Sequence, residues 1–428
     1  MSTTAWLAII IFVASYTLII SEKVHRTIAA LMGGVLMILC GIISQEKALT
    51  HIDFNTLGLL VGMMIMVIIT IQSGLFNYLS IWTAKKAKGN PVVLLIFLSI
   101  LTAVCSAFLD NVTTVLLTVP ITLSITSKLK VTPTPFIFSQ IMASNIGGTA
   151  TLIGDPPNIM IGSAVKELDF MAFLTNLSGV CTIILIVTVS ILLFIYRKDL
   201  KTTDELKAGV MRMDERRMIK RPRLLRKCLF VLGLTIGTFM LHSHLNIQTG
   251  TVALSGAAIL MMLTLSRNGR ILNRIFSKVE WTAIFFFVGL FIMVGALVET
   301  GVIGMMAEKM MMLTKGDLTA TAMTILGFGA VMSAFVDNIP FVATMIPLIK
   351  DMGLMGMTNL TPLWWALSLG ACLGGNGTII GASANVVAIA IAAQRGYRIS
   401  FTQYMKIAFP LMLLSVVISA VFLYVEYL

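Results

Sequence analysis

The sequence predicts an all-α polytopic membrane protein built from two inverted repeats. Three observations lead to this class: the composition, the spacing of the apolar runs, and a second half that matches the first. Of the 428 residues, 57% are hydrophobic and only 12% are charged, whereas soluble domains carry about 25% charged residues. The short alternating segments of a transmembrane β-barrel are not what the sequence shows.

Apolar runs of roughly 20 residues, long enough to cross a bilayer as helices, recur along the chain. Clear examples are 3–20, 27–43, 55–71, 174–196, 246–265, 281–298 and 407–425. The first has no positively charged region before it, so we interpret it as a spanning helix and not as a cleaved signal peptide. We expect about 10 spanning helices plus two re-entrant hairpins.

Basic residues set the expected orientation. Residues 197–227 hold 12 of the 31 Lys and Arg residues, and a basic loop between apolar spans marks the cytoplasmic side. Threading from this loop puts the N-terminus outside and the basic residues of 23–26, 85–88, 128–130, 267–278 and 395–406 inside. Only Lys47, Lys166, Lys309, Lys315 and Lys350 remain outside. The expected partner is therefore the lipid bilayer of the cell membrane and not nucleic acid, and a lipid-headgroup or regulatory role of the loop stays open.

An internal repeat appears when the sequence is shifted by 227 residues. SAFLDN, 106–111, falls on SAFVDN, 333–338, and GGTATLIGDPPN, 147–158, falls on GGNGTIIGASAN, 374–385. On the threaded path the helices 55–71 and 281–298 run in opposite directions. Inverted repeats of this kind are typical of secondary transporters and place the binding site where the copies meet.

The repeat gives a division of the chain. We expect N-terminal scaffold helices at 1–52, repeat 1 at 53–196, a cytoplasmic basic linker at 197–227, further scaffold helices at 228–278 and repeat 2 at 279–428. Repeat 1 contains a hairpin at 91–125 and a broken helix at 136–163, and repeat 2 contains a hairpin at 318–350 and a broken helix at 363–393.

A polar pair interrupts the apolar sequence of each hairpin: Asp110 and Asn111 in the first, Asp337 and Asn338 in the second. An acid within a membrane segment is costly and indicates function. Asp and Asn also bond to nearby backbone and so interrupt helices. We predict that each pair forms a hairpin tip. Two full membrane spans would also return the chain to the same side, so the basic residues do not decide between spans and a hairpin. For each aspartate, a purely structural role as a helix cap is the alternative.

The second polar element is a spanning stretch broken by Gly and, in repeat 1, by Pro156 and Pro157. Glycine allows close backbone approach and proline removes backbone donors. The match to a phosphate loop is poor, because GxxxxGK[ST] is missing. Asp155 has Ala382 as its repeat partner, so a third site acid and a simple helix cap are both open. Glu280 and Asp53 are expected at the membrane interface.

Together the motifs predict an ion site without an organic cofactor. Carboxylate, carbonyl and hydroxyl oxygens suit hard cations such as Na⁺, so the coupling ion is Na⁺ or H⁺, with Na⁺ placed at Asp110, Asn111, Asp337 and Asn338. No Lys or Arg lies within the motifs, which weakens the case for a bulky di- or tricarboxylate, although helix N-termini also hold anions. The predicted substrate- and ion-binding residues are Ser106, Asp110, Asn111, Thr113, Asn145, Gly147, Gly148, Thr149, Thr151, Gly154, Asp155, Asn158, Ser333, Asp337, Asn338, Gly374, Gly375, Asn376, Thr378, Gly381, Ser383 and Asn385.

Four stretches, AFLDNVTTVLLTVPIT, NIGGTATLIGDPPNIMIGSA, DNIPFVATMIPLI and GACLGGNGTIIGASANVVAIA, resemble the ArsB/NhaD branch of the ion transporter superfamily. Within it they look most like the melanosomal P protein and its prokaryotic relatives. The resemblance covers essentially the whole chain. It implies a fold like that of the divalent anion/sodium symporters, a citrate transporter-like domain, a homodimer, and an elevator movement of the part that holds the hairpins and broken helices.

The expected function is secondary active transport of a small inorganic ion, coupled to Na⁺ or H⁺ and antiporter-like. An arsenite, chloride or carboxylate permease of the same fold is the alternative. A passive channel would need no site exposed alternately to each side. An intramembrane aspartyl protease would need a GxGD-type motif, which neither FLDN nor FVDN supplies. We therefore expect that the protein is not an enzyme.

Overall fold

The computed structural model describes residues 2–21, 23–265 and 269–428. Arg267, which the predicted topology counts on the inner side, lies outside the described residues. Within them every regular element is a helix, and nine helices are long and apolar enough to cross a membrane by length and composition. Three of those nine, α6 (Pro91–Phe108), α7 (Asn111–Leu129) and α17 (Leu318–Phe335), are hairpin arms. The predicted all-α polytopic class is confirmed.

Six helices form two packed sets of three, and we call the six together the scaffold group. They are α1 (Thr3–Ser21), α2 (Arg26–Leu39), α4 (Phe54–Ile71), α12 (Pro222–Leu241), α13 (Thr249–Thr264) and α15 (Trp281–Glu299). Within the group α2 packs along α15 and α13 packs along α4. Both crossings are close because glycine faces alanine: Gly289 lies against the backbone of Ala30, and Gly62 against that of Ala253. Small residues at a helix crossing let the two backbones approach.

The remaining long elements form the hairpin group. It contains hairpin 1 (α6 and α7), hairpin 2 (α17 and α18, Asn338–Leu354), the broken helices α8–α9 (Thr134–Thr149, Pro156–Ala164) and α19–α20 (Thr361–Gly374, Ser383–Gln394), and the long helices α10 (Phe170–Tyr196) and α21 (Phe401–Glu426). Each hairpin packs on the broken helix that follows it, α6 on α8 and α17 on α19. The arm α7 extends to Leu129 and is therefore longer than the predicted arm.

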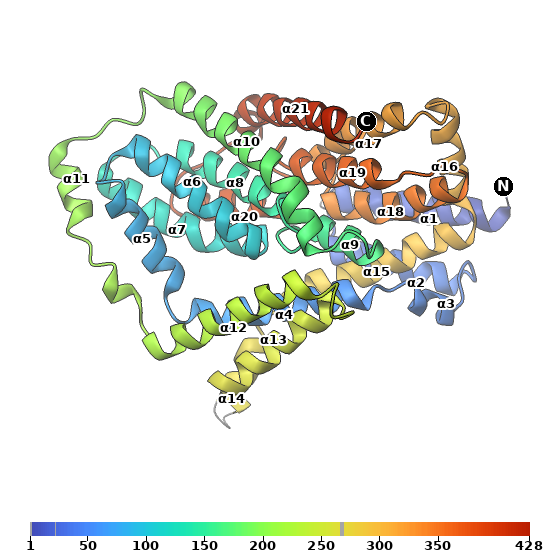
Figure 1. Ribbon diagram of the computed structural model, residues 1–428, viewed down its shortest axis with the longest axis horizontal. Coiled ribbons are helices and arrows are strands. Elements are labelled where there is room, and N and C mark those ends of the chain that lie inside the picture. Colours follow the sequence, from blue (N-terminus) through green and yellow to red (C-terminus); the bar gives the residue numbers. More distant parts are fainter. Residues whose placement is uncertain (1, 22, 266–268) are drawn as a thin grey trace.

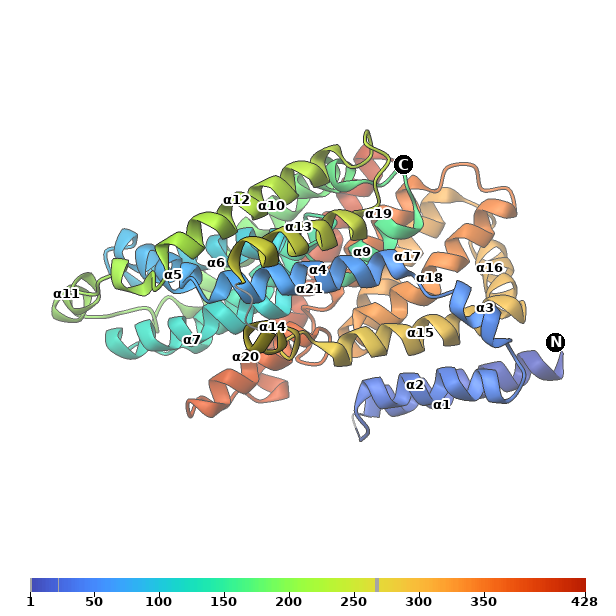
Figure 2. The ribbon, with the colours of Figure 1, turned by 90° about the horizontal axis from the view of Figure 1, so that it is seen from below.

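Short helices mark the two ends of the molecule. Figure 1 shows α5 (Leu75–Lys86) and α11 (Asp204–Met211) at one end of the long axis, and α3 (Gln45–Thr50), α16 (Val302–Leu313) and the N-terminus at the other. Because α5 and α16 are repeat equivalents, their separation shows that the two repeats are inverted. Figure 2 shows α1 and α2 lying along one edge of the molecule.

The basic segment 197–227 is more structured than a plain loop. It contains α11 and a 3₁₀ turn at Arg216–Met218, and α12 already begins at Pro222. The segment docks on the turn between α4 and α5, where the amide of Lys220 donates to the carbonyl of Ser73 at 3.0 Å. Lys85 donates to Glu215 at 2.6 Å and lowers the pKa of that carboxyl. As the pH falls, Glu215 therefore stays ionised, and the charged contact persists, to a lower pH than an unpaired glutamate would allow. After Thr264 the chain continues into α14 (Gly269–Phe276).

Replacing Gly74 by Ala is expected to destabilise the protein more than replacing its repeat equivalent, Gly301. Both backbones are left-handed, with φ of +87° and +74°, so both variants carry strain of about 1–2 kcal/mol. Only at Gly74 would the new Cβ meet another atom at close range, the carbonyl oxygen of Met218 at 1.9 Å, whereas nothing lies within 4 Å at Gly301. Melting temperatures in detergent measure the difference. Equal losses in the two variants would show that the linker does not dock at this turn.

Candidate functional site

Each hairpin turns at an aspartate that caps the second arm. Asp110 precedes α7, where its carboxylate accepts from the amide of Thr113 at 2.9 Å and from the Thr113 hydroxyl. Asp337 precedes α18 and accepts from the amide of Ile339 at 3.2 Å. A carboxylate that accepts from the first free amides of a helix stabilises the helix start and meets its positive dipole end. The local sequence therefore stops one arm and starts the next at the predicted position.

The two broken helices are held open by equivalent asparagines. The Asn158 amide donates to the carbonyls of Thr149 and Thr151, both at 3.0 Å. The Asn385 amide donates to the carbonyls of Gly375 and Thr378, at 2.7 and 2.8 Å. Carbonyls freed by the break would otherwise be unsatisfied inside the membrane, which is costly. Both asparagines thus stabilise the extended segments that separate the half-helices.

Most of the predicted glycines, serines and threonines join a hairpin to its broken helix. Gly147 and Gly374 face the backbones of Ala103 and Ala330, so closely that a Cβ would lie 2.2 and 2.5 Å from their carbonyl oxygens. Equivalent hydroxyl donors repeat the pattern: Ser106 to Ser144, Ser333 to Ala371, Thr151 to Ala107 and Thr378 to Ala334. Gly148 lies against Gly154, and Gly375 against Gly381. These residues meet hairpin backbone or each other, whereas the sequence analysis assigned them to a ligand.

Asn145 connects the two repeats. Its side-chain oxygen accepts from Asn111 at 3.2 Å, and its amide donates to Asn376 at 2.9 Å and to Asn385 at 3.0 Å. The hydroxyl of Thr149 donates to the backbone carbonyl of Asn145. All three partners of the side chain are buried. The tip of hairpin 1 is thereby joined to the break of repeat 2 through a single amide.

The tips and breaks of both repeats line one small cavity of about 50 Å³. Hairpin 1 contributes Asp110 and Asn111, hairpin 2 contributes Asn338, and the two breaks contribute Asp155 and Ser383. The scaffold group closes the cavity with side chains of α4 and α15 and with Glu280, which precedes α15. The sequence analysis expected Glu280 at the interface, and the structure places it beside these polar groups. The inverted repeats therefore bring together groups that are far apart in sequence.

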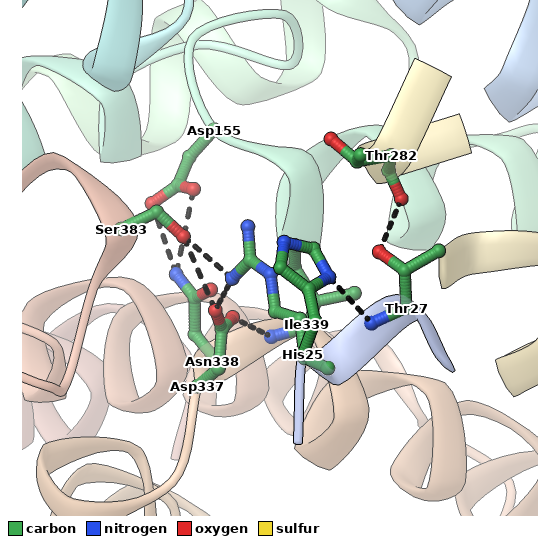
Figure 3. A network of polar contacts seen from close by, with 9 residues as sticks. His25, Thr27, Asp155, Thr282, Asp337, Asn338, Ile339 and Ser383 are labelled. Atoms are coloured by element: carbon green, nitrogen blue, oxygen red, sulfur yellow. Dashed lines mark hydrogen bonds and ion pairs between the residues drawn. The ribbon is translucent and has the colours of Figure 1, made fainter. Parts of the chain in front are cut away.

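Hairpin 2 also reaches into the break of repeat 1. The amide of Asn338 lies 3.4 Å from each carboxylate oxygen of Asp155, and Figure 3 shows these two side chains facing each other beside Asp337 and Ser383. Asp155 is 1% exposed, and its own side chain makes no cap bond at the start of α9. Of the two roles left open for Asp155, this contact favours the site acid over the helix cap.

Arg26 is the residue that the sequence analysis missed. It begins α2, where the predicted topology counts it among the basic residues of an inner turn. In the structure its guanidinium forms an ion pair with Asp337 and donates to the Ser383 hydroxyl at 2.7 Å. The Ser383 hydroxyl in turn donates to Asp337 at 3.2 Å. The motifs themselves contain no Lys or Arg, but the fold brings Arg26 to them. The only sequence signal for this was that Arg26 directly precedes the apolar run 27–43.

The acids are unequally partnered. Among the described residues, the ion pairs within 4 Å include Asp337 but neither Asp110 nor Asp155. In the same part of the chain no three His, Cys, Asp or Glu side chains gather as a metal cluster. The cavity that holds Asp110 and Asp155 is lined by neutral amides and hydroxyls together with the charged side chains of Glu280 and Arg26. Such a donor set suits a weakly held hard cation or a proton better than a transition metal.

Two larger hollows lie at either side of the cavity. The first, about 370 Å³, is lined by Ile19, Ile20, Val24, His25, Arg26, Phe335, Val336, Asp337, Ile380, Ser383, Val386 and Val387, and we call it the vestibule. It shares Arg26 and Ser383 with the cavity. The second, about 280 Å³, contains Asp53, Ser163 and Lys350 and has no lining residue in common with the cavity. Of these two hollows, only the vestibule therefore adjoins the cavity, at Arg26 and Ser383.

Comparison with known proteins identifies the family. The family model described as citrate transporter (CitMHS) matches residues 16–370. The chain belongs to this citrate transporter family. It is 42% identical over 426 residues to an uncharacterized transporter of Mycobacterium tuberculosis, with 98% of both chains covered. It is also 32% identical over 507 residues to the P protein of Homo sapiens, covering 99% of this chain and 60% of that protein.

The fold has a solved counterpart. The crystal structure of the YdaH transporter of Alcanivorax borkumensis, described as having an unusual topology, matches with a TM-score of 0.55 at 14% identity, over 89% of this chain and 87% of that one. The protein is thus a multi-pass membrane transporter of the citrate transporter family. Kinship with the P protein is confirmed, and the ArsB/NhaD branch stays a prediction.

Replacing Asn145 by Ala is expected to lower the melting temperature strongly. The change leaves Asn111, Asn376 and Asn385 short of a partner in a buried site, at about 1–3 kcal/mol for each unsatisfied group. The matched control is Cys372→Ala at the equivalent position of repeat 2. It removes a long sulfur contact of 3.5 Å to Asn158 and the contacts of the thiol with Asp155 and Thr149, but no amide hydrogen bond. Melting in detergent, followed by tryptophan fluorescence, compares the two. A loss no larger than that of the control would mean that Asn145 does not connect the repeats.

Proposed function

We propose that the protein is a secondary active transporter of a small inorganic ion, coupled to Na⁺ or H⁺ in an antiporter-like exchange. The observation that carries the proposal is the cavity in which Asp110 and Asp155 lie next to Asn111 and Asn338, with Glu280 and Arg26 also in its lining. Among the described residues, neither Asp110 nor Asp155 forms an ion pair within 4 Å. A carboxylate in a site of low dielectric binds either a cation or a proton. One site that holds either but not both is sufficient for exchange.

Alternating access follows from how the two helix groups meet. Hairpins and broken helices pack mainly on one another, and few contacts join them to the scaffold group. We infer an elevator movement in which the hairpin group carries the site past the scaffold group. The vestibule adjoins the cavity whereas the second hollow does not, and this difference supports the proposal, because a transporter exposes its site to one side at a time. The homodimer implied by the resemblance belongs to the same proposal, and light scattering of the purified protein measures it.

A second candidate is an anion permease of the same fold. It is favoured by Arg26 and by the helix starts that converge on the cavity, those of α7, α9, α18 and α20. Helix N-termini and an arginine attract anions. In that case the acids would serve the coupling ion and the anion would lie beside them.

The experiment that separates the two is a proton-flux assay. Purified protein is placed in liposomes with an imposed pH gradient and an internal pH dye, and Na⁺, Li⁺, K⁺, chloride, citrate and arsenite are added one at a time. If Na⁺ or Li⁺ collapses the gradient, the antiporter proposal stands. If only an anion or arsenite does so, the permease replaces it.

Asp110→Asn is expected to reduce coupled flux in this assay to the level of empty liposomes, because an amide cannot exchange a cation for a proton. The matched control is Asp317→Asn, which alters a capping aspartate at the far end of α17 whose carboxylate accepts from the amide of Ala320 at 2.7 Å. It should retain flux. Full activity of folded Asp110→Asn protein would exclude Asp110 as the exchanging acid.

A further inference from the structure

The ion pair between Arg26 and Asp337 joins the scaffold group to the hairpin group at the ion site. Arg26 belongs to α2, which packs along α15, and Asp337 forms the tip of hairpin 2. The side chain of Asp337 is 11% exposed and that of Arg26 is 32% exposed. Because Asp337 is largely enclosed, the loss of Arg26 would leave its charge without compensation.

The other repeat lacks this arrangement. The crossing of α2 on α15 at Ala30 corresponds to the crossing of α13 on α4 at Ala253. Arg26 stands four residues before Ala30, and Thr249 stands four residues before Ala253. Thr249 is therefore the equivalent of Arg26. Thr249 accepts from the Asn55 amide at 3.1 Å and carries no charge. Asp110, the equivalent of Asp337, therefore has no tethered cation. The two acids occupy the same position in the repeat but differ in what neutralises them.

We propose that Arg26 is a latch. It is a tethered cation that neutralises Asp337 in the described conformation, and a transported cation or a proton must replace it when hairpin 2 leaves α2. The proposal rests on the proposed function, since it requires that the hairpin group moves relative to the scaffold group and that a cation is carried.

The geometry gives the latch two roles. Asp337 accepts from Ser383 and from the amide of Ile339 as well as from Arg26, so its oxygens are already positioned to bind a small cation once the guanidinium withdraws. Arg26 also lies between the vestibule and the cavity, because it lines both. As long as the pair is intact, a cation that arrives through the vestibule competes with Arg26 for the same carboxylate.

The latch also disfavours movement of the hairpin group while no cation is bound at Asp337. If hairpin 2 left α2 with no cation bound, Asp337 would lose its partner in an enclosed environment. Binding of a cation to Asp337 removes this cost. The Arg26 side chain is 32% exposed and lines the vestibule, where water or an anion can reach the guanidinium.

The first test measures Na⁺ binding to the full-length protein in detergent, from the rise in melting temperature as NaCl replaces choline chloride at constant ionic strength. Arg26→Gln should lower the half-saturating Na⁺ concentration by about tenfold, a modest value for the loss of a close charged competitor. Arg26→Lys, which keeps the charge, should stay near wild type. The gain should vanish in the double variant Arg26→Gln/Asp337→Asn. The control is Arg395→Gln, an exposed position after α20.

The second test does not depend on the ion. A single cysteine at Val386, which lines the vestibule and is 41% exposed, is placed in a background without the five native cysteines and treated with a membrane-impermeant maleimide. Adding Arg26→Gln should slow the reaction several-fold, because the latch no longer holds the conformation with this vestibule. Adding Arg395→Gln should leave the rate unchanged.

The outcomes are distinct. Unchanged Na⁺ binding in folded Arg26→Gln protein, or an unchanged reaction rate at Val386→Cys, would overturn the latch. If wild type itself shows no Na⁺ effect on the melting temperature, but Arg26→Gln still slows the reaction at Val386→Cys, the latch stands and Na⁺ is not the ion of the proposed function. The proton is then the ion that replaces Arg26.

Discussion

The structure depends on one constraint: carboxylates that lie inside a membrane protein must be satisfied without bulk water. Placing an aspartate at the centre of a spanning helix costs about 3 kcal/mol on insertion scales. The chain meets this cost by ending helices at the aspartates, so that Asp110 and Asp337 accept from the amides that begin α7 and α18. Asn338 supplies donors to Asp155. The helix breaks that result are also what frees space for an ion.

Inversion of the repeats then decides where these groups meet. Two hairpins that enter from opposite ends bring their tips to one cavity, and the two broken helices meet them there. Glycines set the distances, because Gly147 and Gly374 let each hairpin lie directly on its broken helix. The same pattern of close contacts is therefore built twice, and we propose that the function depends on two places where the copies differ: Asp155 against Ala382, and Arg26 against Thr249.

Much of this fold was readable from the sequence, because its main signals are local or periodic. Apolar runs predicted the helices, the Asp-Asn pairs predicted the hairpin tips, and Gly with Pro156 and Pro157 predicted a helix break before α9. The inverted arrangement followed from the repeat and the basic residues together. The docking of the linker on Gly74 was not predicted, since nothing in a charged segment tells which turn it will contact.

The site was predicted only in part. Asp110, Asn111, Asp155, Asn338 and Ser383 do line the cavity. Ser106, Ser333, Thr151 and Thr378 instead donate to hairpin or helix carbonyls, because a sequence cannot show whether a hydroxyl in an apolar helix faces an ion or a neighbouring backbone. Arg26 escaped prediction for a different reason. Its partner lies 311 residues away, and only the packing of α2 beside hairpin 2 brings the two charges together.

In the proposed exchange, protons and a transported cation share one set of carboxylates at the cavity. The decisive measurement is equilibrium binding of radioactive Na⁺ to the purified protein, repeated over a series of pH values. We expect saturable binding whose half-saturating Na⁺ concentration rises as the solution becomes more acidic, with the number of sites unchanged. Na⁺ binding that is saturable but independent of pH, or the absence of any saturable binding, would contradict the proposed exchange.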